Sequence, residues 1–299
     1  MSSIAIIGPG AVGGVIAGWL TRRGGHDLTL CARRAVGETT VELLASEPVK
    51  LAATVLTDPA QAGPVDWVLV TTKAYDAAGA AAWFPSLVGP ATRVAILQNG
   101  VEHRERFAPW LAAEKILPVM VDIPAERPAP GRIVQRGPGK MTVPAGDDGA
   151  RFVELFAGTD LTVSETADFK SVVWRKLCHN SVGVINALLL KPAGVFHDEA
   201  VGRLAVAIVR ECLAVGRAEG AVLDDNVPEA VLAAYRASPP DSVNSLHADR
   251  AAGRPMEIDA RNGAIVRFGR QHGIPTPCNE TAATLLARCD GPEPEFFNH

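Results

Sequence analysis

The chain begins with a short apolar run, Ile4 to Ile7, that leads directly into the glycine pattern Gly8-Pro9-Gly10-Ala11-Val12-Gly13. An apolar and alanine-bearing segment, Val15 to Arg23, follows it. A strand, a G-x-G-x-x-G turn and a helix in this order are typical of a dinucleotide-binding site, although a glycine-rich turn can also be purely structural. The three glycines permit a tight turn, close approach of the backbone to a pyrophosphate, and close packing of helix and strand. Because a pyrophosphate binds the free N–H groups at a helix N-terminus, we assign the cofactor site to Gly8, Gly10, Ala11, Val12 and Gly13.

The residues after the second predicted strand, Leu28 to Cys31, indicate which dinucleotide binds. Sites for NAD carry an acidic residue at the end of this strand, where it bonds the ribose 2′-hydroxyl. Here Ala32 and then Arg33-Arg34 occupy that place, and no carboxylate is present. A guanidinium group pairs with a phosphate through a planar fork of donors. We therefore expect Arg33 to bind the 2′-phosphate of NADPH, with Arg34 as the other candidate; the alternative is a solvated charge pair on a loop.

The first half of the chain alternates between predicted strands and helices. Further strands are expected over 65–72, 93–97 and 116–121, with helices over 75–83 and 102–111. This alternation predicts an α/β fold with a doubly wound parallel sheet of the Rossmann type. Two segments, 132–135 and 140–144, flank Gly137-Pro138-Gly139 and are expected to form a hairpin, with a last short strand over 162–163.

Lys73 and Asn99 each follow a predicted parallel strand at its carboxyl end. Ligands of open α/β sheets bind at this edge. We therefore expect both side chains to lie near the cofactor. For Asn99-Gly100 the alternative is a plain turn.

The second half of the chain is predominantly helical. Helical patterns are expected over 168–190, 199–219, 229–237, 243–252, 256–272 and 280–289. The expected N-caps are Asp168, Asp198 and Asn279, and the expected C-terminal stops are Gly220, Gly253 and Gly273. The sequence thus predicts a dinucleotide-binding domain over 1–166, a helical substrate domain over 167–290 and a tail over 291–299.

Composition and charge argue against several classes of protein. The 299 residues carry a net charge of −4 without a basic stripe, so nucleic acid is not an expected partner. No segment approaches the ~18 apolar residues of a membrane helix, and the first residues lack the blocks of a signal peptide. The five cysteines are scattered without paired spacing, which indicates reduced thiols and no zinc site. We expect a cytoplasmic protein that binds no metal and no membrane.

Two groups of polar residues in the helical half are candidates for chemistry. Lys176 and Asn180 lie four residues apart and share a predicted helix face with an apolar stripe. A lysine on an inward face usually has a partner or a task, although its stem can also carry the amine out to solvent. Ser245 lies on a later helix, and Glu257 opens the next one, where the helix dipole favours a carboxylate. Each of these residues alone could also be a cap or a surface group.

Taken together and in order, these pieces resemble the ketopantoate reductase family (2-dehydropantoate 2-reductase) over nearly the full chain. The matching segments are Gly8 to Gly14, Thr72-Lys73, Gln98-Asn99-Gly100, Trp174 to Asn180, Ser245 to Asp249 and Glu257-Ile258-Asp259. The resemblance implies an N-terminal Rossmann domain, a helical C-terminal domain and an active site in the cleft between them. It implies reduction of a small 2-oxo acid by NADPH. The chain itself would act as a monomer or a homodimer.

The resemblance also assigns the two catalytic roles. Lys176 would be the general acid that protonates the ketone oxygen while NADPH delivers hydride to the carbon. Glu257 would hold the substrate hydroxyl. This chemistry is sensible on its own terms, because hydride addition builds negative charge on oxygen and a positioned ammonium group both stabilises and protonates it.

Four further residues would bind substrate or cofactor if the resemblance holds. Asn99 would position nicotinamide and substrate, and Lys73 would lie beside them. Asn180 would bond the substrate hydroxyl, and Ser245 its carboxylate. One position departs from the family, because the second asparagine that usually follows four residues after Asn180 is here Val184. We expect Val184 to face the substrate and to favour a 2-oxo acid that lacks the hydroxyl.

Two other functions remain as alternatives. One is an opine or 3-hydroxyacid dehydrogenase on a similar two-domain plan. The other is a non-catalytic sensor that binds NADPH and keeps the fold. A sensor would be expected to lose Lys176 or Glu257, and the chain carries both.

Overall fold

The computed structural model describes residues 1–35 and 37–289. They form two compact units. The first comprises Met1–Asn99 and His103–Phe169, and the second comprises Gly100–Glu102 and the described residues from Lys170 onward. The segment 291–299, for which we expected a tail, lies outside the described residues.

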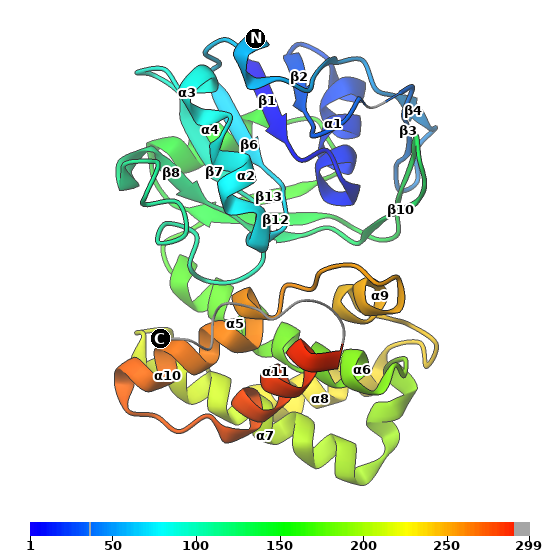
Figure 1. The fold of residues 1–299 in the computed structure, drawn as a ribbon, viewed down its shortest axis with the longest axis vertical. Coiled ribbons are helices and arrows are strands. Elements are labelled where there is room, and N and C mark those ends of the chain that lie inside the picture. Colours follow the sequence, from blue (N-terminus) through cyan, green and yellow to red (C-terminus); the bar gives the residue numbers. More distant parts are fainter. Residues whose placement is uncertain (36, 290–299) are drawn as a thin grey trace. The chain divides into compact units, whose positions relative to one another are not determined.

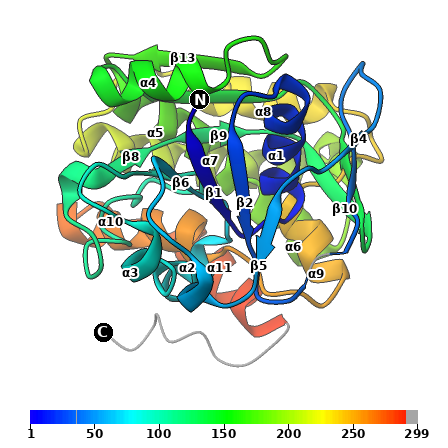
Figure 2. The same cartoon turned by 90° about the horizontal axis from the view of Figure 1, so that it is seen from above.

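The first unit is built on a parallel sheet with the strand order β5-β2-β1-β6-β7-β8 (Figures 1 and 2). Its strands are β5 (Thr54–Leu56), β2 (Asp27–Cys31), β1 (Ser3–Ile7), β6 (Trp67–Val70), β7 (Arg93–Ile96) and β8 (Ile116–Pro118). The order is that of a Rossmann sheet, in which strands are added first on one side of β1 and then on the other. Ile7 is in register with both Cys31 and Val70, so the central strands end at one edge. The predicted doubly wound parallel sheet is confirmed.

Helices cover both faces of this sheet (Figure 2). They are α1 (Ala11–Arg23), α2 (Ala77–Ala81), α3 (Phe84–Leu87) and α4 (Asp147–Leu155). Successive side chains of a strand point to opposite faces. Ile4 and Ile6 accordingly join a core with residues of α1 and α4, whereas Ala5 and Ile7 join a core with residues of α2 and α3. The near-continuous apolar character of β1 reflects this burial on both sides.

Two small sheets complete the first unit. One has the order β10 (Ala125–Ala129), β11 (Arg132–Gln135), β3 (Thr40–Glu42) and β4 (Val49–Lys50), and the other β13 (Thr162–Thr166), β12 (Lys140–Pro144) and β9 (Met120–Asp122). The predicted hairpin between 132–135 and 140–144 is therefore wrong. β11 forms its hairpin with β10 and uses its other edge for β3, while β12 pairs with β9 and β13. Pro138 between them has no N–H to add to a ladder.

Two other predictions for the first unit are wrong because of prolines. The segment 102–111 forms a series of turns and no regular helix. Pro109 cannot donate a helical hydrogen bond, and its ring disfavours helical geometry in the residues before it. The strand expected over 116–121 is divided into β8 and β9, which belong to different sheets. Pro118, which also lacks an N–H, ends β8.

The second unit is helical. Its regular helices are α5 (Phe169–Ser181), α6 (Gly183–Leu189), α7 (Glu199–Ala218), α8 (Val227–Ala237), α9 (Ser245–Ala251), α10 (Ala264–His272) and α11 (Pro277–Cys289). A π-helix, Asp259–Gly263, runs directly into α10. Short 3₁₀ turns lie at Pro59–Gln61, Ala74–Asp76, Ala113–Lys115 and Ala193–His197. Among the described residues, no helix combines the length and the apolar character needed to cross a membrane.

Most predicted helices of the second unit exist, but some boundaries differ. The N-cap Asp198 is confirmed, because its carboxylate accepts the N–H groups of Ala200 and Val201 at 2.8 and 3.0 Å. The helix expected over 168–190 is divided at Val182 into α5 and α6. The helix expected over 256–272 begins only at Asp259. A π-helix is a rare element that is frequent at functional sites.

The prediction of Asn279 as an N-cap is wrong, because α11 begins two residues earlier, at Pro277. Asn279 is fully buried, and its amide donates to the carbonyl oxygen of Ile208 at 3.0 Å and to the Glu211 carboxylate at 2.7 Å. That carboxylate also accepts the N–H groups of Cys278 and Asn279 at 2.8 and 2.9 Å. Glu211 on α7 thus satisfies the first turn of α11, where N–H groups have no intrahelical partner and the dipole favours an anion.

We expect Glu211→Ala to lower the free energy of unfolding by about 2 kcal/mol, because several donors at the start of α11 lose a charged acceptor. Urea denaturation followed by circular dichroism measures this change. Glu229→Ala is the matched control, since Glu229 is an exposed carboxylate at the start of α8 whose ion pair, with Arg210 at 2.8 Å, is also exposed. An exposed pair of this kind contributes little, so the control should match the parent. Equal stability of both variants would contradict the capping role.

Candidate active site

The loop between β1 and α1 is held in place by neighbouring strands. The N–H of Gly8 donates to the carbonyl oxygen of Cys31 at 3.0 Å, and the Thr71 hydroxyl donates to the carbonyl oxygen of Gly8 at 2.8 Å. Gly8 has a φ of +82°, which L side chains rarely adopt. A Cβ on Gly13 would lie 2.3 Å from the Thr71 hydroxyl oxygen and 2.8 Å from the carbonyl oxygen of Gly8. Both positions therefore require glycine.

The start of α1 is suited to a pyrophosphate. Gly10 is the N-cap, no side chain caps the helix, and its first turn contains no acidic residue. The first N–H groups of a helix have no intrahelical partner. A Cβ on Gly10 would meet only the carbonyl oxygen of Gly8, at 3.8 Å, so the space above the loop is open. The residues from Gly8 to Gly13 thus fit a dinucleotide phosphate on geometric grounds.

The ends of β6 and β7 are bonded to each other at the same edge of the sheet. The Gln98 amide nitrogen donates to the Thr72 hydroxyl at 3.0 Å and to the carbonyl oxygen of Lys73 at 3.3 Å. A ring nitrogen of His103 lies 3.1 Å from the carbonyl oxygen of Gln98. Gln98 is only 4% exposed. These bonds fix the backbone that carries Lys73 and Asn99.

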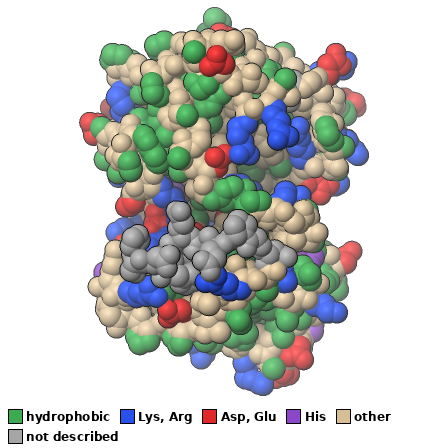
Figure 3. Space-filling view, in the orientation of Figure 1, with side chains coloured by type: hydrophobic (Ala, Val, Ile, Leu, Met, Phe, Trp, Pro, Cys, Tyr) green, Lys and Arg blue, Asp and Glu red, His purple; other side chains and the backbone are tan. Residues whose placement is uncertain are grey.

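Arg33 lies two residues after the end of β2 and is largely exposed. Its guanidinium group is 3.8 Å from the carboxylate of Asp76, which follows β6. An exposed pair at this distance is weak, so the guanidinium group can turn towards an anion. Figure 3 shows a group of Lys and Arg side chains on the face of the first unit that is drawn.

In the second unit, α5 carries Lys176 and Asn180 as half-buried side chains. Its last turn is fixed on both sides of Asn180. The Tyr235 hydroxyl donates to the carbonyl oxygen of His179 at 3.1 Å, and the Asn262 amide donates to that of Ser181 at 3.1 Å. The carbonyl groups at a helix C-terminus need such external partners. Two buried side chains from other helices thus hold the backbone around Asn180.

Glu257 is 3% exposed and precedes the π-helix, so the expectation that it opens a helix is wrong. The chain around Pro255 has no regular structure, because proline disfavours helical geometry in the residue before it.

The π-helix itself is anchored by Arg267, which pairs with Glu102 at 2.7 Å and with Asp259. Burial alone would lower the pKa of Arg267, but the bonds and charges of these two carboxylates outweigh it and raise that pKa.

Ser245 is exposed at the first turn of α9. The Asn244 side chain caps this helix by accepting the N–H of His247 at 3.0 Å. The hydroxyl oxygen of Ser245 accepts a hydrogen bond of 2.8 Å from the guanidinium group of Arg261. Sequence reasoning missed Arg261, which is 4% exposed in the π-helix. The sequence carried no clear signal for Arg261, because charged and polar residues such as Asp259 and Asn262 stand beside it.

Val184, which we expected to face the substrate, is fully buried in α6. The expectation assumed one continuous helix, but α5 ends at Ser181 and α6 begins at Gly183. Asn186, the polar residue of α6 two positions after Val184, makes its hydrogen bonds within the protein. Its amide nitrogen donates to the carbonyl oxygen of Lys191 at 2.9 Å, and its amide oxygen accepts a bond of 2.8 Å from Asn244. Neither residue presents a free polar group to a ligand.

The predicted site residues fall into one group in each unit. The first unit carries Gly8, Gly10, Ala11, Val12, Gly13, Arg33, Lys73 and Asn99 in the segments that follow β1, β2, β6 and β7. The second carries Lys176, Asn180, Ser245 and Glu257. Sequence reasoning missed the supporting side chains Gln98, Tyr235, Arg261 and Asn262, whose partners are distant in sequence.

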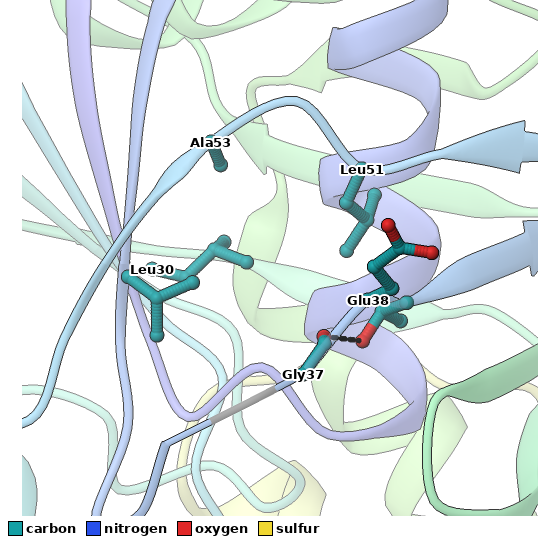
Figure 4. Close-up of a pocket in the computed structure, with 7 residues that line it drawn as sticks. Leu30, Gly37, Glu38, Leu51 and Ala53 are labelled. Carbon is teal, nitrogen blue, oxygen red and sulfur yellow. Dashed lines mark hydrogen bonds between the residues drawn. The ribbon is translucent and has the colours of Figure 1, made fainter.

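A separate pocket lies beside β2 in the first unit (Figure 4). Leu30, Leu51 and Ala53 are among the residues that line it. Two further lining residues are bonded to each other, because the Thr39 hydroxyl donates to the carbonyl oxygen of Gly37 at 3.0 Å. None of the predicted site residues is among those that line this pocket.

Within residues 1–35 and 37–289, no group of three or more His, Cys, Asp or Glu side chains could hold a metal ion. Cys178 and Cys212 are fully buried, with their sulfur atoms 3.5 Å apart. Burial is the main cause that raises the pKa of the Cys212 thiol. A buried thiol of raised pKa is a poor nucleophile, so this pair is part of the packing of α5 and α7.

Comparison with known sequences identifies the family. The family described as "Ketopantoate reductase PanE/ApbA" matches residues 4–148, and its C-terminal counterpart matches residues 168–289. The chain belongs to the ketopantoate reductase PanE/ApbA family. It is 54% identical over 290 residues to a 2-dehydropantoate 2-reductase of Caulobacter vibrioides, covering 96% of this chain and 98% of that protein. A protein of the same name from Mycobacterium tuberculosis is 38% identical and covers 97% of this chain and 99% of its own length.

A solved structure agrees with this assignment. The PanE/ApbA family ketopantoate reductase from Ralstonia eutropha JMP134 superimposes with a TM-score of 0.86 at 30% identity. The alignment covers 95% of this chain and 97% of that chain. The recognised family and the observed fold are therefore consistent.

We expect Gly13→Ala to weaken the binding of a nicotinamide dinucleotide by at least about tenfold, equivalent to ~1.4 kcal/mol. The added methyl group collides with the Thr71 hydroxyl and the carbonyl oxygen of Gly8, so the loop must shift. Isothermal titration calorimetry measures the affinity. Gly63→Ala is the matched control, because nothing lies within 4 Å of its added methyl group. Unchanged affinity in Gly13→Ala would contradict this role of the loop.

Proposed function

We propose that this protein catalyses the NADPH-dependent reduction of a small 2-oxo acid to the 2-hydroxy acid, with ketopantoate or a close relative as substrate. The observation that carries the proposal is the 54% identity, across both units, to a protein named 2-dehydropantoate 2-reductase. The glycine loop at the start of α1 and the Lys176-Asn180 pair on α5 support it.

The first unit would bind the cofactor. Backbone N–H groups at Ala11, Val12 and Gly13 would receive the pyrophosphate at the start of α1. Arg33 would bind the 2′-phosphate, since no carboxylate stands at the end of β2. The bound nicotinamide would supply a hydride to the carbonyl carbon of the substrate, and Lys73 and Asn99 would lie beside it.

The second unit would provide the proton and hold the acid. As the carbonyl carbon is reduced, negative charge develops on its oxygen. The ammonium group of Lys176 would stabilise this charge and then donate its proton to the oxygen, after which the neutral amine regains a proton from water. Glu257 and Asn180 would hold the substrate hydroxyl, and Ser245 the carboxylate.

A panel of 2-oxo acids tests this function against two alternatives. The absorbance of NADPH at 340 nm is followed with purified protein and each acid. Consumption of NADPH with ketopantoate or a related acid supports the proposal. Turnover only with an amine present, or only with a 3-oxo acid, would favour an opine or 3-hydroxyacid dehydrogenase. No turnover with any substrate would favour a non-catalytic sensor, against which the presence of both Lys176 and Glu257 argues.

We expect the protein to bind NADPH more tightly than NADH, because Arg33 contributes a charge-assisted bond to the 2′-phosphate. Arg33→Ala should lower the affinity for NADPH by roughly ten- to a hundredfold. The affinity for NADH should not change. Fluorescence titration gives both dissociation constants. Arg34→Ala removes the same charge one residue later and shows which of the two arginines makes the contact. Equal affinities of the parent for NADPH and NADH would refute the assignment.

We expect Lys176→Ala to lower kcat by roughly 10²–10⁴, because the developing oxyanion loses its acid. NADPH affinity and melting temperature should remain those of the parent. The matched control is Arg175→Ala, which removes an exposed cation from the adjacent position of α5, 3.8 Å from Asp224. A parent-like kcat in Lys176→Ala would rule out the acid role. A joint loss of cofactor affinity and melting temperature would show that Lys176 is structural.

A further inference from the structure

Arg261 is a buried cation, only 4% exposed. It forms no ion pair with a side chain of the described residues, 1–35 and 37–289. Its one recorded side-chain hydrogen bond runs from Nη2 to the neutral hydroxyl of Ser245 at 2.8 Å. Its Nε is buried and has no hydrogen-bond partner. The guanidinium group therefore has N–H donors that lack a hydrogen-bond partner among the described residues.

Such a group is costly unless an anion joins it, because removing a charge from water without a partner is strongly unfavourable. Arg267, six residues later, shows the usual solution. It is less buried than Arg261 and yet pairs with two carboxylates, those of Glu102 and Asp259. The contrast indicates that the partner of Arg261 is not a side chain of the described chain.

The surroundings of Arg261 would place an anion bound there near the predicted substrate residues. Ser245, which shares the bond with Arg261, is exposed on α9. Burial raises the pKa of Tyr235 to about 12, and the nearby charge of Arg261 partly opposes that rise. The same Tyr235 hydroxyl donates to the carbonyl oxygen of His179, the residue before Asn180. Arg261 thus bonds the first turn of α9 and lies near Tyr235, which bonds the last turn of α5.

We infer that Arg261 binds the carboxylate of the substrate, together with the hydroxyl of Ser245. The inference rests on the proposed function and names the group that selects an acid over a neutral ketone. A guanidinium fork matches a carboxylate through parallel N–H···O bonds, and Ser245 adds a third donor once its hydroxyl turns to the same anion. Replacing Arg261 would then raise KM for the acid, whereas replacing Lys176 would lower kcat.

If Arg261 only joined α9 to the π-helix, its replacement would lower the melting temperature or weaken the binding of acid and amide alike. The test uses Arg261→Gln, which keeps a donor to Ser245 but removes the charge, and Arg261→Lys, which keeps the charge without the fork. Arg270→Gln is the matched control, because it removes an exposed cation from α10 that pairs with Glu280 at 2.7 Å. Melting temperatures of all variants report folding.

The first readout is binding, measured by calorimetry with pantoate and with its uncharged primary amide in the presence of NADP⁺. We expect the parent to prefer pantoate. Arg261→Gln should bind pantoate at least tenfold more weakly, bind the amide as the parent does, and keep its melting temperature. Arg261→Lys should lie between the two, and Arg270→Gln should match the parent. In the kinetic readout, KM for ketopantoate should rise at least tenfold in Arg261→Gln, with kcat changed by less than about threefold.

The outcomes separate this inference from the proposed function. If the parent reduces no 2-oxo acid but prefers pantoate to the amide through Arg261, the proposed function fails and the inference stands. If the parent reduces ketopantoate and Arg261→Gln retains its KM, or loses affinity for acid and amide alike, the inference is overturned and the function stands. A parent that binds neither compound and reduces no 2-oxo acid overturns both.

Discussion

The glycine loop between β1 and α1 depends on how closely the side chain of Thr71 approaches it. Its hydroxyl bonds the carbonyl oxygen of Gly8 and leaves no space for a Cβ on Gly13. This contact lets α1 begin directly above the end of β1, with its unpaired N–H groups at the carboxyl edge of the sheet. The bond from Gly8 to Cys31 brings the end of β2 to the same place. The geometry of the glycine loop is therefore set by packing that tolerates no larger residue.

The second unit is organised by buried polar groups that must find partners. Asn262 and Tyr235 bond the backbone on either side of Asn180, and Glu211 completes the start of α11. These bonds join elements that are far apart in the sequence, and two of them hold the backbone at the end of α5. Arg261 is the contrasting case, because its buried guanidinium group bonds one hydroxyl and no recorded carboxylate among the described residues. A ligand-binding unit can carry such a group when the ligand supplies the opposite charge.

Local patterns predicted the elements whose stability is local. The strand, glycine turn and helix at the start of the chain were predicted correctly, as was the Asp198 cap, because both depend on neighbouring residues. The predictions failed where pairing is decided at a distance. The segments 132–135 and 140–144 look like a hairpin, yet each has a better partner elsewhere in the first unit. Val184 lies one turn from Asn180 in sequence, but the break at Val182 and the surrounding core remove it from the surface.

The sequence by itself determined the Rossmann sheet, the glycine loop, the absence of an acidic residue after β2, and the candidate residues Lys176, Asn180, Ser245 and Glu257. These features follow from residue type and spacing, which a linear pattern contains. Only the tertiary structure decided which strands share a sheet, that Val184 is inaccessible, and that the Arg261 guanidinium group meets Ser245 without a recorded carboxylate partner among the described residues. The physical reason is that burial and charge pairing depend on residues that are distant in sequence. A sequence therefore shows that a residue is charged, but the folded structure decides whether that charge has a partner.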